Sequence, residues 1–313
     1  MKCLLCKSDN IAVANTYPKQ LLENLWTRIG VDVSSELKLN NLALYRCRNC
    51  GLDFFDPVLA GGDKFYSQLG KFEWYYLHPG KTEYDYVQQF IHPGDKILDI
   101  GSGSGVLYSK IKVNVDYTGL ELSTKAVELA QAADINVKQE DLLIHAENNQ
   151  SKYDIVCLFQ VLEHLSELDE FVKSIYLTLK SKGLFFIAVP DNEGFVSKTP
   201  NYLFNLPPHH SILWKESSLR YLANKFNFDV LQVVREPLQD VHKDIAYKSY
   251  LISNLKKLAF KKSLLLDDSP THDLFSRIVN RVLRVDRFKK IIYPLVAKKQ
   301  KLGQSIIIVL QKR

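Results

Sequence analysis

The sequence predicts an α/β protein built on a doubly wound parallel sheet, with a small metal-binding module before the sheet and a basic helical insertion near the C-terminus. Three observations predict this architecture. A glycine-rich turn follows a short apolar run at 96–105, two Cys-x-x-Cys pairs lie within the first 50 residues, and a segment rich in Lys and Arg separates the last two predicted strands. Strands and helices alternate between 91 and 238, which is typical of a parallel sheet covered by helices on both faces.

The glycine-rich turn predicts a ligand site. The strand 96–100 (KILDI) runs directly into GSGSG, and a helix can begin after the last glycine. Glycines lack Cβ atoms, so a ligand can lie against the backbone of such a turn. The following helix directs its free N–H groups and the positive end of its dipole toward that ligand. The residues concerned are Asp99, Gly101, Ser102, Gly103 and Gly105.

Polar residues follow the next three predicted strands. Glu121 ends the strand 117–121, where a carboxylate can accept hydrogen bonds from both ribose hydroxyls of a nucleoside. Asp141 closes a third short strand and can receive an adenine amino group. The apolar strand 153–159 ends in Gln160, followed by Glu163 and His164. All of these lie at the carboxyl edge of the sheet, where open α/β sheets bind ligands.

These four motifs, in this order and spacing, resemble those of class I S-adenosylmethionine-dependent methyltransferases over about 84–234 and the last strand. The resemblance implies a seven-stranded mixed sheet whose last strand, about 304–311, is antiparallel, and S-adenosylmethionine as methyl donor. The residues expected to bind the donor are Asp99, Gly101, Ser102, Gly103, Gly105, Glu121, Leu122, Asp141, Leu142, Phe159 and Gln160. A nicotinamide-binding Rossmann domain is the alternative, but GxGxG replaces GxGxxG and no separate substrate domain is visible.

The cysteine spacing predicts a structural zinc site. Cys3 and Cys6 form one Cys-x-x-Cys pair and Cys47 and Cys50 the other, and this spacing places two sulfurs on one side of a tight turn. The alternatives are two unrelated reduced pairs or a redox dithiol, although neither pair opens a helix after a strand. The fifth cysteine, Cys157, is expected to be a small core residue.

The residues 45–57 that contain the second pair resemble the zinc-binding N-terminal region of a group that includes nucleotide-sugar C-methyltransferases. The expected organisation is a zinc-binding module at 1–60, a linker and aromatic helical lid at 61–90, the methyltransferase core at 91–238, a basic helical insertion at 239–303 and the last core strand at 304–313. Most lid aromatics are expected to pack in a core. Tyr75, Tyr76 and Tyr84 are candidate pocket residues.

Two histidine sites are candidates for the chemistry of the acceptor. The stretch PPHHSILW resembles a family stretch in which a histidine reaches the substrate pocket, so His210 is the first candidate for general base and His209 the second. The alternative is that one histidine only bonds a loop carbonyl. Glu163 and His164 are expected near donor or acceptor, and the resemblance implies that this pair holds a divalent ion in some relatives. The alternative there is a helix-capping Glu163 with His164 pointing into the core.

The predicted function is methyl transfer to a small or medium polar acceptor such as a sugar, a glycan precursor or a natural-product intermediate. RNA methylation is an alternative, but FQVLEHL replaces the Asn/Asp-Pro-Pro-aromatic pattern of amino-directed nucleic-acid enzymes, and no nucleic-acid partner is expected. A non-catalytic scaffold is another alternative, against which the intact donor motifs argue. No apolar run reaches the eighteen or more residues of a membrane span, and the N-terminus lacks a signal-peptide pattern, so a cytoplasmic location is expected.

The formal net charge of +6 is unevenly distributed, since the residues from Asp240 onward carry seventeen Lys and Arg against six Asp. Apolar residues recur at helical spacing over 250–258 and 275–288, which predicts two helices. They could pack on the core with a solvated basic face. They could instead dock on an anionic surface, either the inner leaflet of the membrane through 250–290 or a phosphorylated carrier of the substrate.

Overall fold

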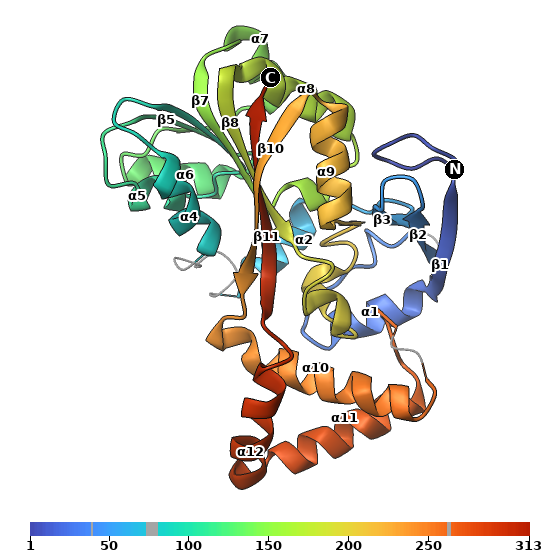
Figure 1. The fold of residues 1–313 in the computed structure, drawn as a ribbon. Helices are drawn as coiled ribbons and strands as arrows, with labels where there is room; N and C mark the ends of the chain where they lie inside the picture. Colours follow the sequence, from blue (N-terminus) through green and yellow to red (C-terminus); the bar gives the residue numbers. More distant parts are fainter. Residues whose placement is uncertain (39, 73–80, 262–263) are drawn as a thin grey trace.

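The computed structural model describes residues 1–313 except 39, 73–80 and 262–263, and it contains a seven-stranded mixed sheet at its centre (Figure 1). The strands lie in the order β10-β11-β8-β7-β4-β5-β6. Strands β4 to β8 are parallel, and β11 is antiparallel to both of its neighbours. The fold class and the antiparallel last strand are therefore confirmed. The strands are β4 Lys96–Ile100, β5 Asp116–Leu120, β6 Val137–Lys138, β7 Tyr153–Phe159, β8 Leu179–Pro190, β10 Phe228–Pro237 and β11 Leu302–Lys312.

Both faces of this sheet are buried. Neighbouring residues of one strand point to opposite faces, and accordingly Leu98 and Ile97 of β4 lie in two different hydrophobic clusters. Cys157 of β7 is fully buried in the second cluster, as expected. The helices around this sheet are α4 Thr82–Val87, α5 Val106–Lys110, α6 Thr124–Ala132, α7 Leu142–Asn148, α8 Leu168–Thr178 and α9 Glu216–Lys225, with short 3-10 turns η1 Gln88–Phe90, η2 Leu162–His164, η3 Val196–Lys198 and η4 Leu203–Asn205.

The N-terminal residues form a second, antiparallel sheet that includes a strand from the other end of the core. Its order is β1-β2-β3-β9, and β9 begins two residues after His210. Phe54 of β3 pairs with Ile212 of β9, and Asp53 pairs with Leu213. The elements are β1 Ile11–Pro18, α1 Lys19–Thr27, β2 Asn41–Cys47, β3 Asp53–Asp56, α2 Asp63–Leu69 and β9 Ile212–Leu213. No pattern in the sequence predicted this shared sheet.

The insertion before β11 contains three helices in the described residues, gathered at one end of the molecule in Figure 1. They are α10 Asp240–Leu258, α11 Pro270–Leu283 and α12 Asp286–Ala297. The expectation of one helix over 275–288 was wrong. Val285 has an extended backbone, and Asp286 opens a new helix with an acid in its first turn, where the helix dipole favours negative charge.

Among the described residues, no helix combines the length and the apolar character needed to cross a membrane.

Candidate functional site

The glycine turn after β4 has the conformation that its sequence predicts. Gly101, Gly103 and Gly105 have φ values of +71°, +55° and +77°. A Cβ on Gly101 would lie 2.4 Å from a methyl carbon of Val161, and one on Gly105 would lie 2.7 Å from a methyl carbon of Ile135. Backbone conformation and close packing thus both require glycine at these two positions. The contact with Val161 also places the segment after β7 beside the turn.

Glu121 lies against this turn. Its carboxylate accepts the backbone N–H of Gly103 at 2.9 Å and the N–H groups of Leu122 and Ser123 at 2.8 Å each. The structure therefore brings together two motifs that lie eighteen residues apart. Leu122, also expected at the donor site, is 67% exposed next to Glu121.

The other expected donor residues surround the same edge of the sheet. Asp99 is buried beneath the turn, where it accepts a 2.8 Å hydrogen bond from the Tyr117 hydroxyl, and burial raises its pKa to about 7. Asp141 caps α7 by accepting the N–H of Leu143 at 2.8 Å. The helix therefore uses one carboxylate oxygen of Asp141. Leu142, which follows Asp141, is buried.

The end of β7 completes this edge. Phe159 is buried, and the centroids of the Phe159 and Tyr84 rings lie 5.9 Å apart. The other two candidate pocket residues, Tyr75 and Tyr76, lie outside the described residues. Gln160 has a positive φ of 59°, and its side-chain amide donates to Glu83 at 3.2 Å and Ser305 at 3.0 Å. Sequence reasoning missed the buried Glu83, since nothing in the spacing of TEYDYV distinguishes it from a surface acid.

The two candidate catalytic pairs meet in one buried cluster. One ring nitrogen of each of His164, His209 and His210 lies within 4.8 Å of the others. The Oε1 atom of Glu163 lies 3.7 Å from Nε2 of His210. We call these four residues the His–Glu cluster. It joins the segment after β7 to the loop before β9, which are more than forty residues apart in the chain.

Hydrogen bonds orient two of these histidines. His164 Nδ1–H donates to the His209 carbonyl at 2.6 Å, with the Tyr66 hydroxyl also 3.2 Å away. His209 Nδ1–H donates to the Phe204 carbonyl at 3.2 Å. A carbonyl only accepts, so Nδ1 carries the proton and Nε2 keeps its lone pair in both neutral rings.

The other two groups lack such partners. Both carboxylate oxygens of Glu163 and Nδ1 of His210 are buried without a hydrogen-bond partner among the described residues. The alternative of a helix-capping Glu163 was therefore wrong. Because buried polar groups are normally hydrogen-bonded, an unpartnered carboxylate beside three imidazoles indicates a site that receives a ligand.

Burial controls the charges of the His–Glu cluster. It raises the pKa of Glu163 to about 8. It lowers the pKa of His164 to about 4, and together with the neighbouring imidazoles it holds the pKa of His209 and His210 well below the ordinary range. The imidazoles are therefore neutral at pH 7, the form that accepts a proton or ligates a divalent metal ion.

The N-terminal module holds the histidine loop in place. Trp26 Nε1–H donates to the Pro207 carbonyl at 2.9 Å, and this bond is buried. The Phe55 N–H donates to the Ser211 carbonyl at 2.8 Å, and the Leu59 N–H donates to the Ser211 hydroxyl at 2.9 Å. Residues on both sides of His209 and His210 are thus fixed by the first 60 residues. No sequence motif marked these contacts.

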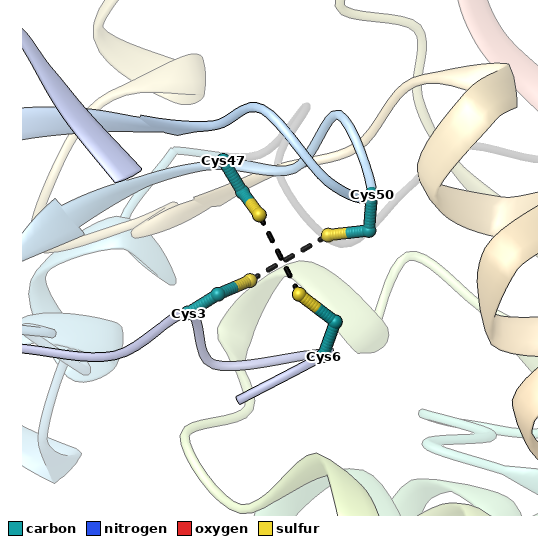
Figure 2. A group of neighbouring side chains, drawn as sticks. All are labelled: Cys3, Cys6, Cys47 and Cys50. Carbon is teal, nitrogen blue, oxygen red and sulfur yellow. Dashed lines mark hydrogen bonds between the residues drawn. The ribbon is translucent and has the colours of Figure 1, made fainter. Parts of the chain in front are cut away.

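The four cysteines of the two Cys-x-x-Cys pairs converge on one point (Figure 2). Their sulfur atoms all lie within 4.8 Å of one another, with Cys3 Sγ and Cys50 Sγ 3.5 Å apart and Cys6 Sγ and Cys47 Sγ 3.5 Å apart. Four sulfurs around a zinc ion with bonds of 2.3 Å would be separated by about 3.8 Å. The arrangement therefore fits a tetrahedral zinc site with four cysteine ligands.

Known proteins that are similar to this chain are named methyltransferases. Residues 79–233 match a family described as a methyltransferase domain. A ubiquinone biosynthesis O-methyltransferase from Photorhabdus laumondii is 31% identical over 108 residues, which are 32% of this chain and 45% of that protein. One from Shewanella halifaxensis is 25% identical over 166 residues, covering 47% and 70% of the two chains. A methyltransferase structure from Archaeoglobus fulgidus has a TM-score of 0.49 and 17% identity, covering 80% of this chain and all of that one.

The chain spans less than half the length of the first curated relatives that it matches, 41% and 45% for two of them. The matched region includes the glycine turn, Glu121, the end of β7 and the loop with His209 and His210. Over residues 79–233, just under half of the chain, the protein is similar to methyltransferase domains.

Proposed function

We propose that this protein transfers the methyl group of S-adenosylmethionine to a hydroxyl oxygen of a small or medium polar acceptor. The observation that carries the proposal is the position of the His–Glu cluster beside the donor edge. Val161 packs on Gly101 of the glycine turn, and Glu163 and His164 follow two and three residues later. A group that can accept the acceptor's proton therefore lies next to the expected position of the methyl donor.

The chemistry needs little covalent help from the protein. Methyl transfer from a sulfonium is an in-line displacement, for which orientation of the two reactants can supply ~7–11 kcal/mol. A hydroxyl acceptor must also lose its proton. His210 is proposed as the group that takes this proton, with His209 as the second candidate. Oε1 of the Glu163 carboxyl group lies 3.7 Å from Nε2 of His210, where a carboxyl oxygen can stabilise the imidazolium that forms.

Oxygen as the methylated atom is supported by the relatives, which are named O-methyltransferases. The acceptor classes proposed are a sugar, a glycan precursor or a natural-product intermediate. A panel of nucleotide sugars, glycan precursors and hydroxylated aromatic compounds, incubated with methyl-labelled donor, tests this directly. Labelled product that His210→Gln reduces at least tenfold, with unchanged donor affinity, supports the proposal.

A matched control separates this role from folding. His145 is buried outside the cluster and hydrogen-bonded to Tyr153 at 2.7 Å, so His145→Gln should leave the transfer rate per folded molecule unchanged. Transfer only to nitrogen, carbon or RNA acceptors contradicts the oxygen assignment. Donor binding without transfer to any acceptor would instead support a scaffold.

The His–Glu cluster also has the ligand types of a divalent metal site. The same assay on the wild-type protein with and without a chelator, with the zinc content of the four-cysteine site measured in both samples, separates a proton-accepting histidine from a metal-held acceptor. Activity that survives chelation supports the general-base assignment. Activity that is lost and then restored by Mn²⁺ assigns the cluster to a metal.

We also propose one structural zinc ion held by Cys3, Cys6, Cys47 and Cys50, in a protein of the reducing cytoplasm. The support is the convergence of the four sulfurs in Figure 2. Protein purified without chelator should contain about one zinc per chain, and Cys6→Ser should lose it. Metal-free protein with an intact β1-β2-β3-β9 sheet would contradict the assignment.

A further inference from the structure

Helices α11 and α12, with the residue Val285 between them, expose seven large apolar side chains. We call this set the outer face, and it consists of Leu274, Ile278, Val282, Val285, Phe288, Ile291 and Leu295. Each of these side chains is more than a third exposed, and Ile291 and Leu295 are 56% and 61% exposed. Leu274, Ile278 and Val282 follow one another at intervals of four, which places them on one side of α11. A helix side that only meets water does not need this pattern.

Other side chains of the same helices make the contacts that hold the insertion together. Val279 and Leu283 of α11 are buried and pack in a cluster with Ile252 of α10. Val296 of α12 is buried with Tyr247 of α10. In Figure 1, α11 lies on the side of α10 that faces away from the two sheets. The outer face is therefore not needed for the packing of the insertion.

Basic residues surround this apolar series. Residues 270–301 contain nine Lys and Arg against two Asp. Arg281 follows Ile278 by three residues and Leu274 by seven, so it lies on the same side of α11 as they do. Lys289 pairs with Asp244 of α10 at 3.1 Å, but Arg281, Arg284, Arg287 and Lys290 have no acidic partner in the described part of the chain. An apolar series within unpaired positive charge is complementary to an anionic lipid surface.

We infer that the outer face docks on an anionic membrane surface. Its apolar side chains would enter the boundary between headgroups and acyl chains, while the unpaired Arg and Lys side chains contact lipid phosphates. The insertion lies outside the matched methyltransferase region 79–233, so this inference goes beyond the proposed catalysis. The protein would then work at a membrane surface that none of its described helices crosses.

Co-sedimentation of the full chain with vesicles tests this inference. Vesicles of phosphatidylcholine alone are compared with vesicles containing one quarter phosphatidylglycerol, at low and high salt. Wild-type protein should sediment with the anionic vesicles and be released by salt. A contribution of ~1 kcal/mol per basic residue corresponds to about a fivefold change in vesicle binding for each charge. The Arg281→Gln, Arg284→Gln double variant should therefore bind anionic vesicles about 25-fold more weakly. Phe288→Ser with Ile291→Ser should weaken it by at least tenfold.

Leu129→Ser provides the matched control, because Leu129 is a similarly exposed apolar residue on α6, far along the chain from the insertion. This variant should bind vesicles as wild type does. All variants should also bind S-adenosylmethionine with wild-type affinity, and this measurement distinguishes a docking defect from misfolding. Equal binding to both kinds of vesicle, or to neither, overturns the inference. If the protein forms a dimer that the Phe288→Ser, Ile291→Ser double variant dissociates, the outer face is a dimer interface and the inference is overturned. If the protein binds oligonucleotides through Arg281 and Arg284 and does not bind vesicles, the inference is also overturned.

Discussion

Glu121 connects the second strand to the glycine turn through three backbone N–H groups. A carboxylate in this position is already oriented by the backbone, so its free lone pairs can receive ribose hydroxyls with little reorganisation. The same contact shows why the two motifs must occur together, since each holds the other in place.

We expect Glu121→Ala to weaken S-adenosylmethionine binding by roughly 10- to 100-fold, because hydrogen bonds to a charged group contribute ~1.5–3 kcal/mol. Isothermal titration calorimetry of the two proteins measures this. Glu128→Ala on the exposed side of α6 serves as control and should bind like wild type. Unchanged affinity in Glu121→Ala would remove this carboxylate from the donor site.

Glu163 makes stability depend on pH. Burial raises its pKa from 4.5 to about 8, so between these values the folded protein holds a proton that the unfolded chain has released. Stability from this group is therefore present at low pH and falls as pH rises toward 8. From pH 6 to pH 8 the free energy of unfolding should fall by about 2 kcal/mol through Glu163.

Glu163→Gln should abolish the pH dependence that comes from Glu163. The free energy of unfolding of this variant, relative to that of wild type, should therefore increase by about 2 kcal/mol from pH 6 to pH 8. Urea unfolding at pH 6 and pH 8 in the presence of chelator gives both values. Glu147→Gln, an exposed acid on α7, should show the wild-type dependence. A constant difference between Glu163→Gln and wild type at the two pH values would mean that Glu163 ionises normally in the folded protein.

Among the secondary-structure elements, β9 links the N-terminal module to the histidine loop. It pairs with β3, while Trp26 and Phe55 bond the loop on either side of the two histidines. The position of His209 and His210 therefore depends on a module that contributes no expected donor-binding residue. The first 60 residues are in this sense part of the acceptor side of the site.

Zinc removal should accordingly affect catalysis more than donor binding. We expect Cys6→Ser to lower methyl transfer at least tenfold while donor affinity changes less than threefold, because the expected donor residues lie at the carboxyl ends of β4, β5, β6 and β7 and not in the module. Labelled-methyl transfer and calorimetry measure the two quantities. Equal losses of both would show that the module supports the whole core and not the histidine loop in particular.

Some elements could be predicted from the sequence and others could not, for physical reasons. The glycine turn and the strands around it follow from local patterns, since an apolar run, a glycine series and a carboxylate each constrain their own neighbourhood. The two-residue strand β9 has no pattern of its own and exists only because β3 lies beside it. The break at Val285 was missed because the apolar spacing continues across it.

Over the full chain, the site is assembled from segments that lie far apart in the sequence. The sequence predicted the members of the His–Glu cluster as two separate pairs. Only the fold brings the three histidines within 4.8 Å of one another and Glu163 within 3.7 Å of His210. The hydrophobic core is similarly shared. One cluster contains Cys3, Cys47 and Leu52 of the N-terminal module together with Leu98 and Ile306 of the large sheet. The module and the large sheet therefore share one hydrophobic cluster.

The helical insertion should behave differently from this shared core. Its contact between α10 and α11 is centred on three buried residues, Ile252, Val279 and Leu283, whereas β7 is buried on both faces of the large sheet. Segments with few buried apolar contacts open at lower free energy than the core. Amides of α11 and α12 should therefore exchange with solvent deuterium at least tenfold faster than those of β7.

Hydrogen-exchange mass spectrometry of the free protein measures this difference. Donor at saturating concentration should slow exchange in the peptides containing the glycine turn and Glu121 and leave those of α11 and α12 unchanged, because the insertion contributes none of the expected donor residues. Exchange in α11 as slow as in β7 would show that the insertion is an integral part of the core. Its exposed apolar residues would then lie on a rigid surface, and not on a segment that can adjust to the surface it meets.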